Sequence, residues 1–399
     1  MPNNSVGTPR IESRLPNVGT TIFSIMSELA REHGAVNLGQ GYPGFNPPEA
    51  LVSLVSQAMI DGHNQYAPMT GVPALRQAIH AKMLMLHGHA YDADREITVT
   101  SGATQAIMAA VFATLHPGDE AIILEPAYDS YLPSIQLAGA RPVPVPLLPP
   151  DHTNPFYRVD WQRVRDAITP RTRLLMLNFP HNPTGAVLAD HDLDALEALV
   201  RDTPIVIMSD EVYEHIVFDN RRHLSMATRP LLAARSFVIS SFGKTYHSTG
   251  WKVGYCCAPE PLMREFRKVH QFMVYSVNTP MQVALATFMQ DPATYTGLAD
   301  FYQERRDYLT AGLRRTRLKP MPSAGTFFLL ADYSEVSGSS QEEFVRWLTI
   351  EHGVTAIPVS AFYVDPAAFE REQGIRLIRL CFAKDYDILD LALQRLQSL

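Results

Sequence analysis

The sequence predicts an α/β protein with a large domain, in which helices cover a mostly parallel β-sheet, and a smaller α+β domain. Three observations predict this fold. Short apolar runs alternate with helical patterns between about residues 95 and 260. Polar side chains follow most of these runs directly, as they do at the carboxyl ends of parallel strands. Beyond about residue 290, charged helical stretches are followed by apolar runs at 325–333 and 374–385, which indicates a separate unit.

The alternation is regular along the central part of the chain. Residues 104–115 carry apolar side chains at the spacing of one helical face, and six short apolar runs follow. Runs of this length that are rich in β-branched residues predict strands buried on both faces. The six runs are 121–124, 143–145, 173–179, 204–208, 236–241 and 253–258.

Composition limits the class of protein. Of 399 residues, 46% are hydrophobic and 19% charged, which is enough apolar material for a substantial core. The net charge of −7 does not match a nucleic-acid-binding protein. We find neither a signal peptide nor an apolar run long enough to span a membrane. The three cysteines match neither a disulfide framework nor a zinc site, so we expect a cytoplasmic protein without a bound metal.

Residues 101–104, Ser-Gly-Ala-Thr, lie between a predicted strand and a predicted helix. Small residues at a helix N-terminus allow the backbone N–H groups to approach a phosphate. Alternatively, these residues only cap the helix. Ser241 and Lys252, which flank the segment around Lys244, add a hydroxyl and a cation that could hold the same phosphate.

Lys244 follows a buried strand, so it is either a solvated loop residue or a desolvated amine ready for Schiff-base chemistry. Asp210 ends another strand, and it either caps a helix or pairs with the cationic nitrogen of a buried heterocycle. Tyr213 reaches the same space if its segment is helical. Asn182 belongs to a turn or to the site, and Tyr128 packs in the core or against a ligand.

None of these motifs is specific alone. Together they supply a phosphate-binding segment, an aromatic side chain that can stack on a ring, an amide, an acid for a ring nitrogen and a lysine for a Schiff base. This set of groups matches pyridoxal 5'-phosphate (PLP), a cofactor that acts as an electron sink and depends on the protein for its position and electronics.

The order of the motifs closely resembles that of class I and II aminotransferases of PLP fold type I. The motifs are SGAT, EPAYDSY, NFPHNPTG, SDEVYEH, SFGKTYHSTGWKVGY and IRLCFA, and the resemblance covers nearly the whole chain from about residue 15. Within this superfamily, the sequence most resembles bacterial methionine aminotransferases and kynurenine or glutamine aminotransferases. The segments that carry this likeness are 36–48, 64–76, 240–255 and 352–363.

The resemblance implies a division of the chain and an assembly. Residues 1–47 would form an N-terminal arm that contributes to the small domain and the active site. Residues 48–290 would form the large PLP-binding domain, and residues 291–399 the small C-terminal domain. The protein would be a homodimer with shared active sites, and its other partners would be amino acids and 2-oxo acids.

The resemblance also assigns roles to the site residues. Lys244 would bear the cofactor and move a proton as general base and acid, and Asp210 would pair with the pyridine nitrogen. Tyr213 and Asn182 would contact the phenolic oxygen, with Tyr128 over the ring. These assignments make Lys244, Asp210 and Tyr213 the catalytic residues. The phosphate would be held by Ala103, Thr104, Ser241, Lys252 and the partner subunit's Tyr66.

The substrate would be held by Gly39, Asn182 and Arg379, which grip the α-carboxylate, and by Tyr42. One position departs from the family. An arginine commonly stands eight residues after the lysine, where this chain has Lys252. A lysine binds phosphate as a point charge and lacks the bidentate fork of an arginine.

The implied activity is transfer of the α-amino group from methionine, aromatic or other uncharged amino acids to a 2-oxo acid by a ping-pong mechanism. Residues 270–280 are apolar and aromatic where aspartate-specific relatives carry an extra arginine, and Phe23, Tyr42 and Phe328 extend this pocket. Two alternatives stay open. A PLP-dependent carbon–sulfur β-lyase uses the same cofactor residues. A PLP-sensing regulator needs a DNA-binding module, for which the N-terminal residues are too few.

Overall fold

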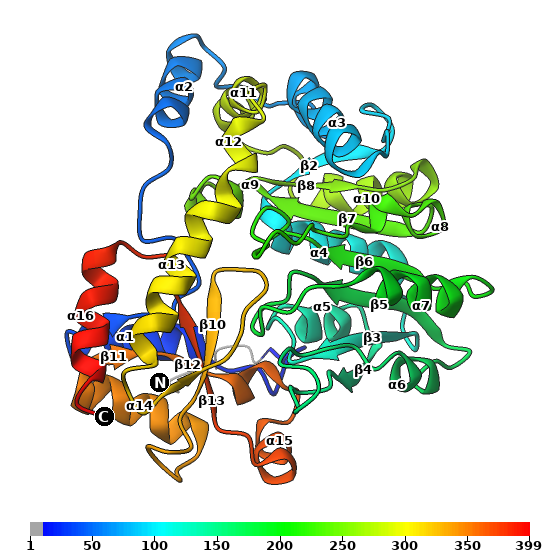
Figure 1. Ribbon diagram of the computed structural model, residues 1–399. Coiled ribbons are helices and arrows are strands. Elements are labelled where there is room, and N and C mark those ends of the chain that lie inside the picture. The colour runs from blue at the N-terminus through cyan, green and yellow to red at the C-terminus, as the bar shows by residue number, and fades with distance from the viewer. Residues whose placement is uncertain (1–10) are drawn as a thin grey trace, which may run out of the picture.

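The computed structural model describes residues 11–399 and contains a large and a smaller unit side by side (Figure 1). The large unit is built on a seven-stranded sheet with the strand order β2-β8-β7-β6-β5-β3-β4. Its strands are β2 (Ile97–Thr100), β3 (Glu120–Glu125), β4 (Arg141–Pro146), β5 (Thr172–Asn178), β6 (Val206–Asp210), β7 (Ser236–Ser241) and β8 (Gly254–Cys257).

The prediction of a mostly parallel sheet is confirmed. The pairs β3–β4, β3–β5, β5–β6 and β6–β7 are parallel. Strand β8 departs from this direction, because it runs antiparallel to both β2 and β7. Each of the six predicted runs overlaps one strand of this sheet, and the runs at 173–179, 204–208 and 253–258 extend one or two residues beyond their strands.

Helices cover both faces of the large sheet. One face packs against α4, α5 and α10, and the other packs against a larger apolar core that includes α2, α3, α7 and α11. The helices of this unit are α2 (Glu49–Ile60), α3 (Pro73–His87), α4 (Gly102–Thr114), α5 (Tyr131–Leu137), α6 (Trp161–Asp166), α7 (Asp190–Val200), α8 (Pro230–Ala233), α9 (Phe242–Thr245), α10 (Glu260–Met273) and α11 (Thr279–Phe288). Burial on both faces explains why β3 and β5 consist mainly of aliphatic side chains.

The smaller unit contains a four-stranded antiparallel sheet with the order β12-β13-β10-β9. A parallel pair, β1–β11, ties the start of the chain to this unit. The long helix α13 extends from α12, beside the large unit, into the smaller unit (Figure 1). The elements are α1 (Ile22–Glu32), β1 (Val36–Asn37), α12 (Ala293–Thr296), α13 (Leu298–Leu313), β9 (Lys319–Pro320), β10 (Phe328–Asp332), α14 (Gln341–His352), β11 (Val354–Thr355), β12 (Ile357–Pro358), α15 (Pro366–Gln373), β13 (Leu377–Cys381) and α16 (Tyr386–Leu396).

The N-terminal segment packs with the C-terminal part of the chain. Met26 and Leu38 are buried in the same apolar cluster as Phe344 and Leu380. The domain boundaries at 47/48 and 290/291 stay predictions, and residues 1–10 of the expected arm lie outside the described residues. Among residues 11–399, no helix has the length and apolarity that a membrane span requires.

The sheet register brings polar side chains together at one edge. Asn178 ends β5 and is the neighbour of Asp210, which ends β6. Ser241 ends β7, the next strand across the sheet. Because the carboxyl ends of parallel strands meet at one edge, these three residues line the same space.

Candidate active site

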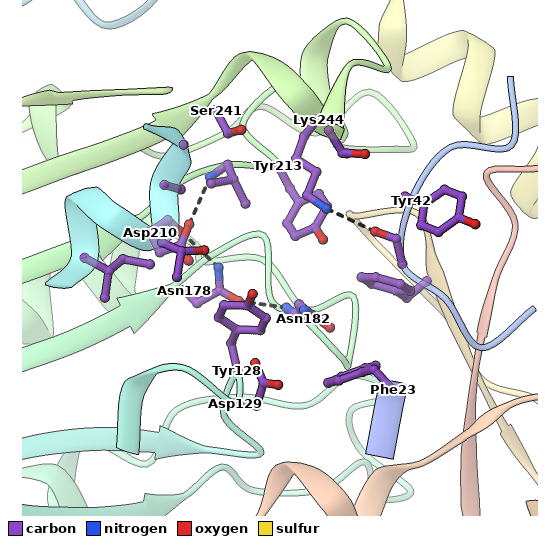
Figure 2. Close-up of a pocket in the computed structure, with 18 of the residues that line it drawn as sticks. Phe23, Tyr42, Tyr128, Asp129, Asn178, Asn182, Asp210, Tyr213, Ser241 and Lys244 are labelled. Carbon is purple, nitrogen blue, oxygen red and sulfur yellow. Dashed lines mark hydrogen bonds between the residues drawn. The ribbon is translucent and has the colours of Figure 1, made fainter. Parts of the chain in front are cut away.

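A cavity of about 340 Å³ lies at the carboxyl ends of β5, β6 and β7, between the two units (Figure 2). Most of the residues predicted for the site line it. They are Tyr42, Ala103, Thr104, Tyr128, Asn182, Asp210, Tyr213, Ser241, Lys244, Lys252 and Arg379. Phe23 and Phe328, which were predicted for the substrate pocket, also line the cavity. Gly39 and Tyr66 do not line it, and neither does the segment 270–280 that was predicted for the substrate pocket, where Phe272 is 87% exposed.

Lys244 lies on the short helix α9, directly after β7, and its side chain points into the cavity (Figure 2). Its Nζ donates a hydrogen bond to the Gly41 carbonyl at 3.0 Å. Ser241 fixes the start of α9, because its hydroxyl accepts a hydrogen bond from the Gly243 N–H at 3.2 Å. Burial lowers the pKa of Lys244 to about 8. The alternative of a solvated loop lysine is therefore wrong, and the amine is available as a nucleophile or base near neutral pH.

Asp210 is buried at the end of β6 and faces the cavity. Its Oδ2 accepts a hydrogen bond from the Tyr131 hydroxyl at 2.6 Å, and its Oδ1 accepts one from the Val212 N–H at 3.3 Å. Burial raises the pKa of Asp210 to about 6, despite these hydrogen bonds. Asp210 caps no helix, because residues 211–215 form turns. The segment around Tyr213 forms turns and not a helix, and the Tyr213 side chain still reaches the cavity.

A chain of amide hydrogen bonds connects this edge of the sheet to the smaller unit. The Asn178 Nδ2 donates to the Asp210 carbonyl, and the Asn178 Oδ1 accepts from the Asn182 N–H, both at 3.0 Å. The Asn182 Oδ1 then accepts from Arg379 Nη1 at 2.8 Å. Asn182 is therefore a buried residue of the site and not only part of a turn.

The N-terminus of α4 forms one end of the cavity. Ser101 makes no side-chain capping hydrogen bond, so it does not satisfy the first N–H groups of this helix. Gly102 has a φ of +71°, and a Cβ added there would lie 3.3 Å from Lys252 Nζ. The helix N-terminus and the lysine thus enclose a small space with Ser241 beside it, and this space fits a phosphate.

Arg379 on β13 is 1% exposed, and its hydrogen bonds go to uncharged groups. Besides Asn182, it donates from Nη2 to the Gly39 carbonyl at 2.8 Å. Its guanidinium lies 3.9 Å from the centre of the Phe328 ring, and burial lowers the pKa of Arg379 to about 10. The Gly39 N–H donates to Asn37 Oδ1. Gly39 is connected to the cavity through its carbonyl, which accepts the hydrogen bond from Arg379.

Two predicted residues lie at or outside the cavity mouth. Tyr42 is partly exposed at the mouth, and its carbonyl accepts a hydrogen bond from Lys384 Nζ at 2.9 Å. Tyr66 is 83% exposed and packs edge-on against Tyr275, away from the cavity of its own chain.

Tyr131, Asn178 and Asp129 are among the residues of the site that were not predicted. Tyr131 holds Asp210, Asn178 connects Asp210 to Asn182, and Asp129 lines the cavity beside Tyr128. The sequence signal for Asn178 was its place at the end of an apolar run, as for Asp210. Tyr131 and Asp129 belong to the EPAYDSY motif, from which only Tyr128 was selected.

The residues present fit PLP. The space at the start of α4 suits its phosphate, and in the described part of the chain no cation is in hydrogen-bond contact with the buried Asp210 carboxylate. The buried Lys244 amine lies in the same cavity. These groups have the chemistry that the phosphate, the ring nitrogen and the aldehyde of PLP require.

Comparison with known proteins identifies the family. Residues 34–396 match the family "Aminotransferase class I and II". Methionine aminotransferase of Escherichia coli is 49% identical over 97% of this chain and 98% of its own. An E. coli structure described as having this function superposes with a TM-score of 0.93, over 98% of this chain and all of that chain.

Two further relatives agree with this result. The structure of N-succinyldiaminopimelate aminotransferase from Mycobacterium tuberculosis is 41% identical, with a TM-score of 0.92, over 98% of this chain and all of that chain. Human kynurenine–oxoglutarate transaminase 1 is 34% identical over 90% of each chain. The comparisons support neither the β-lyase nor the regulator alternative. This chain is a PLP-dependent enzyme and belongs to the class I and II aminotransferase family.

Proposed function

We propose that the enzyme transfers the α-amino group of methionine, or of another amino acid with an uncharged side chain, to a 2-oxo acid in two half-reactions. The observation that carries this proposal is the convergence of Lys244, Asp210 and Arg379 on one cavity. Phe23 and Phe328 make its substrate end largely aromatic, which suits a thioether or an aromatic ring. The likeness to an E. coli methionine aminotransferase supports the same donor.

The family resemblance, supported by the positions of the groups that line the cavity, suggests the proposed cofactor contacts. Lys244 would bind PLP covalently, Asp210 would pair with its ring nitrogen, and Tyr213 and Asn182 would contact its phenolic oxygen. Tyr128 would cover the ring face. The phosphate would be held by Ala103, Thr104, Ser241 and Lys252, together with the partner subunit's Tyr66. When bound, PLP supplies an electron sink for the negative charge that develops at the substrate α-carbon.

The residues of the chain perform the remaining tasks. Arg379 binds the α-carboxylate that all amino-acid substrates share, and its planar fork fixes their orientation. Lys244 takes the proton from the α-carbon and later returns a proton, because a pKa of about 8 suits both roles near neutral pH. Asp210 is mostly ionised above pH 6, where it keeps a proton on the ring nitrogen.

A donor panel tests this proposal. Methionine, phenylalanine and aspartate are supplied to the PLP-loaded enzyme, and amino transfer is followed by the absorbance change of the cofactor. We expect methionine and phenylalanine to have a higher kcat/KM than aspartate, because the substrate end is aromatic. The Lys244→Ala variant is the control and should lower turnover by about 10²–10⁴-fold. Aspartate as the best donor, or near-normal turnover by Lys244→Ala, would contradict the proposal.

We also propose a homodimer with shared sites. Tyr66 and Phe272 are 83% and 87% exposed, and Tyr275 lies beside Tyr66, so this face carries large apolar side chains that a second subunit would cover. Light scattering should give the mass of a dimer, and Tyr66→Phe should weaken PLP retention on dilution. A fully active monomer would contradict the shared site.

The proposed location is the cytoplasm. Cys256, Cys257 and Cys381 are all buried free thiols, which agrees with a reducing compartment. Cell fractionation followed by detection of the enzyme tests this proposal, and recovery outside the cytoplasmic fraction would contradict it.

A further inference from the structure

Asp129 places a carboxylate in the cavity that none of the proposed roles uses. It follows Tyr128 in the loop between β3 and α5 and lines the cavity wall. In Figure 2, it lies with Tyr128 on the side of the cavity near Phe23, away from Ser241 and Lys244. Asp129 therefore belongs to the substrate end, whereas the phosphate space lies at the other end.

Backbone N–H groups at Asp129 and Ser130 are the hydrogen-bond partners of the Asp129 carboxylate. Among residues 11–399, it forms no ion pair and no hydrogen bond to another side chain. Burial raises the pKa of Asp129, and the charge of Arg379 lowers it in part. Arg379 itself is bonded to Asn182 and Gly39, and under the proposed function it receives the α-carboxylate of each substrate.

The other cations near the cavity are also placed for different tasks. Lys252 lies beside Gly102 at the phosphate end. Lys384 is buried, donates to the Tyr42 carbonyl and lies 4.6 Å from the centre of the Tyr42 ring. A substrate side chain that reaches past Arg379 therefore meets aromatic rings and the Asp129 carboxylate, and no described residue offers it a free cation.

This environment treats different substrate side chains unequally. An uncharged thioether or aromatic side chain packs against Phe23 and Phe328 and is insensitive to a nearby carboxylate. A side chain that ends in a carboxylate loses water and meets a like charge, and both effects weaken its binding. Repulsion of this kind gives specificity without any added attraction for the preferred substrate.

We propose that Asp129 is a specificity-determining residue that disfavours amino acids and 2-oxo acids whose side chains end in a carboxylate. This inference rests on the proposed function, because it takes Arg379 as the site of the α-carboxylate. It predicts that aspartate, glutamate and 2-oxoglutarate are poor substrates owing to charge repulsion, and not only because a second arginine is missing.

The test uses the PLP-loaded enzyme and the variant Asp129→Asn, which keeps the shape of the side chain and removes its charge. The kcat/KM ratio of aspartate to methionine should rise by about tenfold or more. Asp129→Glu keeps the charge and should keep the low ratio. Asp166→Asn is the matched control, because it removes one carboxylate from the exposed surface of α6, and its ratio should equal that of the wild type.

A binding measurement gives a readout that is independent of turnover. Calorimetry compares succinate, a dicarboxylate, with butyrate, a monocarboxylate of the same chain length. Asp129→Asn should strengthen succinate binding by about tenfold and leave butyrate binding nearly unchanged. Equal effects on both ligands would overturn the inference.

The outcomes also separate this inference from the proposed function. An unchanged aspartate-to-methionine ratio in Asp129→Asn, with normal methionine turnover, would overturn the role of Asp129 and leave the proposed function intact. If the wild type used neither methionine nor phenylalanine, the proposed function would be wrong. The succinate and butyrate measurements would then still decide whether Asp129 repels a second carboxylate.

Discussion

Asp210 and Glu214 are two buried carboxylates four residues apart, at the end of β6 and in the turns that follow it, but their surroundings differ. Burial raises the pKa of Asp210 to about 6, because the Tyr131 hydrogen bond and the attraction of Lys244 cancel only part of the rise that burial causes. Burial also opposes ionisation of Glu214, but the Lys82 ammonium, together with His215 and His87, outweighs burial and holds the pKa of Glu214 well below its usual value.

The comparison separates a structural carboxylate from a functional one. Glu214 receives its cation from α3, because Lys82 Nζ lies 2.7 Å from Glu214 Oε1 and also 2.7 Å from the Tyr255 hydroxyl. Asp210 faces a cavity, and none of the residues that the structure describes brings a cation into contact with it. A buried acid without its own counter-charge is suited to a cationic ligand, which under the proposed function would be the protonated ring nitrogen of PLP.

The largest expected effect on stability comes from Glu214→Gln. The change leaves the buried Lys82 without its counter-charge, so we expect the free energy of unfolding to fall by about 3–5 kcal/mol. Urea unfolding of the cofactor-free protein at pH 8 measures it. Glu265→Gln is the control, because it removes an exposed partner of Lys268 and should change little. Equal stability of the two variants would remove the distinction between Glu214 and a surface carboxylate.

Asp210→Asn should have the opposite sign in the cofactor-free protein. The pKa of Asp210 is raised in the folded state, from 3.8 to about 6, so its ionisation destabilises the fold as pH rises through this interval. The asparagine can still accept the Tyr131 hydrogen bond. We expect the variant to be more stable than the wild type by about 3 kcal/mol at pH 8, with the difference vanishing near pH 4. A variant that is less stable at pH 8 would contradict this account, because it would show that groups within the chain compensate the Asp210 charge in full.

Tyr131→Phe should have a smaller effect than either carboxylate change. It removes the hydroxyl that donates to Asp210 Oδ2 at 2.6 Å, so the charge of Asp210 becomes less stable. Hydrogen bonds to charged groups contribute about 1.5–3 kcal/mol, and we expect a loss near the lower limit in urea unfolding at pH 8. Tyr308→Phe, which removes a surface hydrogen bond to Asp390, is the control. If the two tyrosine variants were equally stable, Tyr131 would not hold the Asp210 charge.

Much of the fold and site was predictable, because one physical rule connects them. The carboxyl ends of parallel strands meet at one edge, so the polar residues after successive apolar runs, such as Asp210 and Lys244, had to lie together. The direction of β8 was not predictable, since the apolar run at 253–258 looks the same in either direction. The ion pair between Lys82 and Glu214 joins residues that are 132 positions apart, so no local sequence pattern predicts it.

The charge on the ring nitrogen tests the central claim most directly. The enzyme is loaded with PLP labelled with ¹⁵N in the ring, and the nitrogen chemical shift is measured at pH 8. We predict a protonated nitrogen in the wild type and in Glu214→Gln, and an unprotonated one in Asp210→Asn. A nitrogen that stays protonated in Asp210→Asn, or that is unprotonated in the wild type, would contradict the assignment of Asp210 as the carboxylate that the fold leaves for the cofactor.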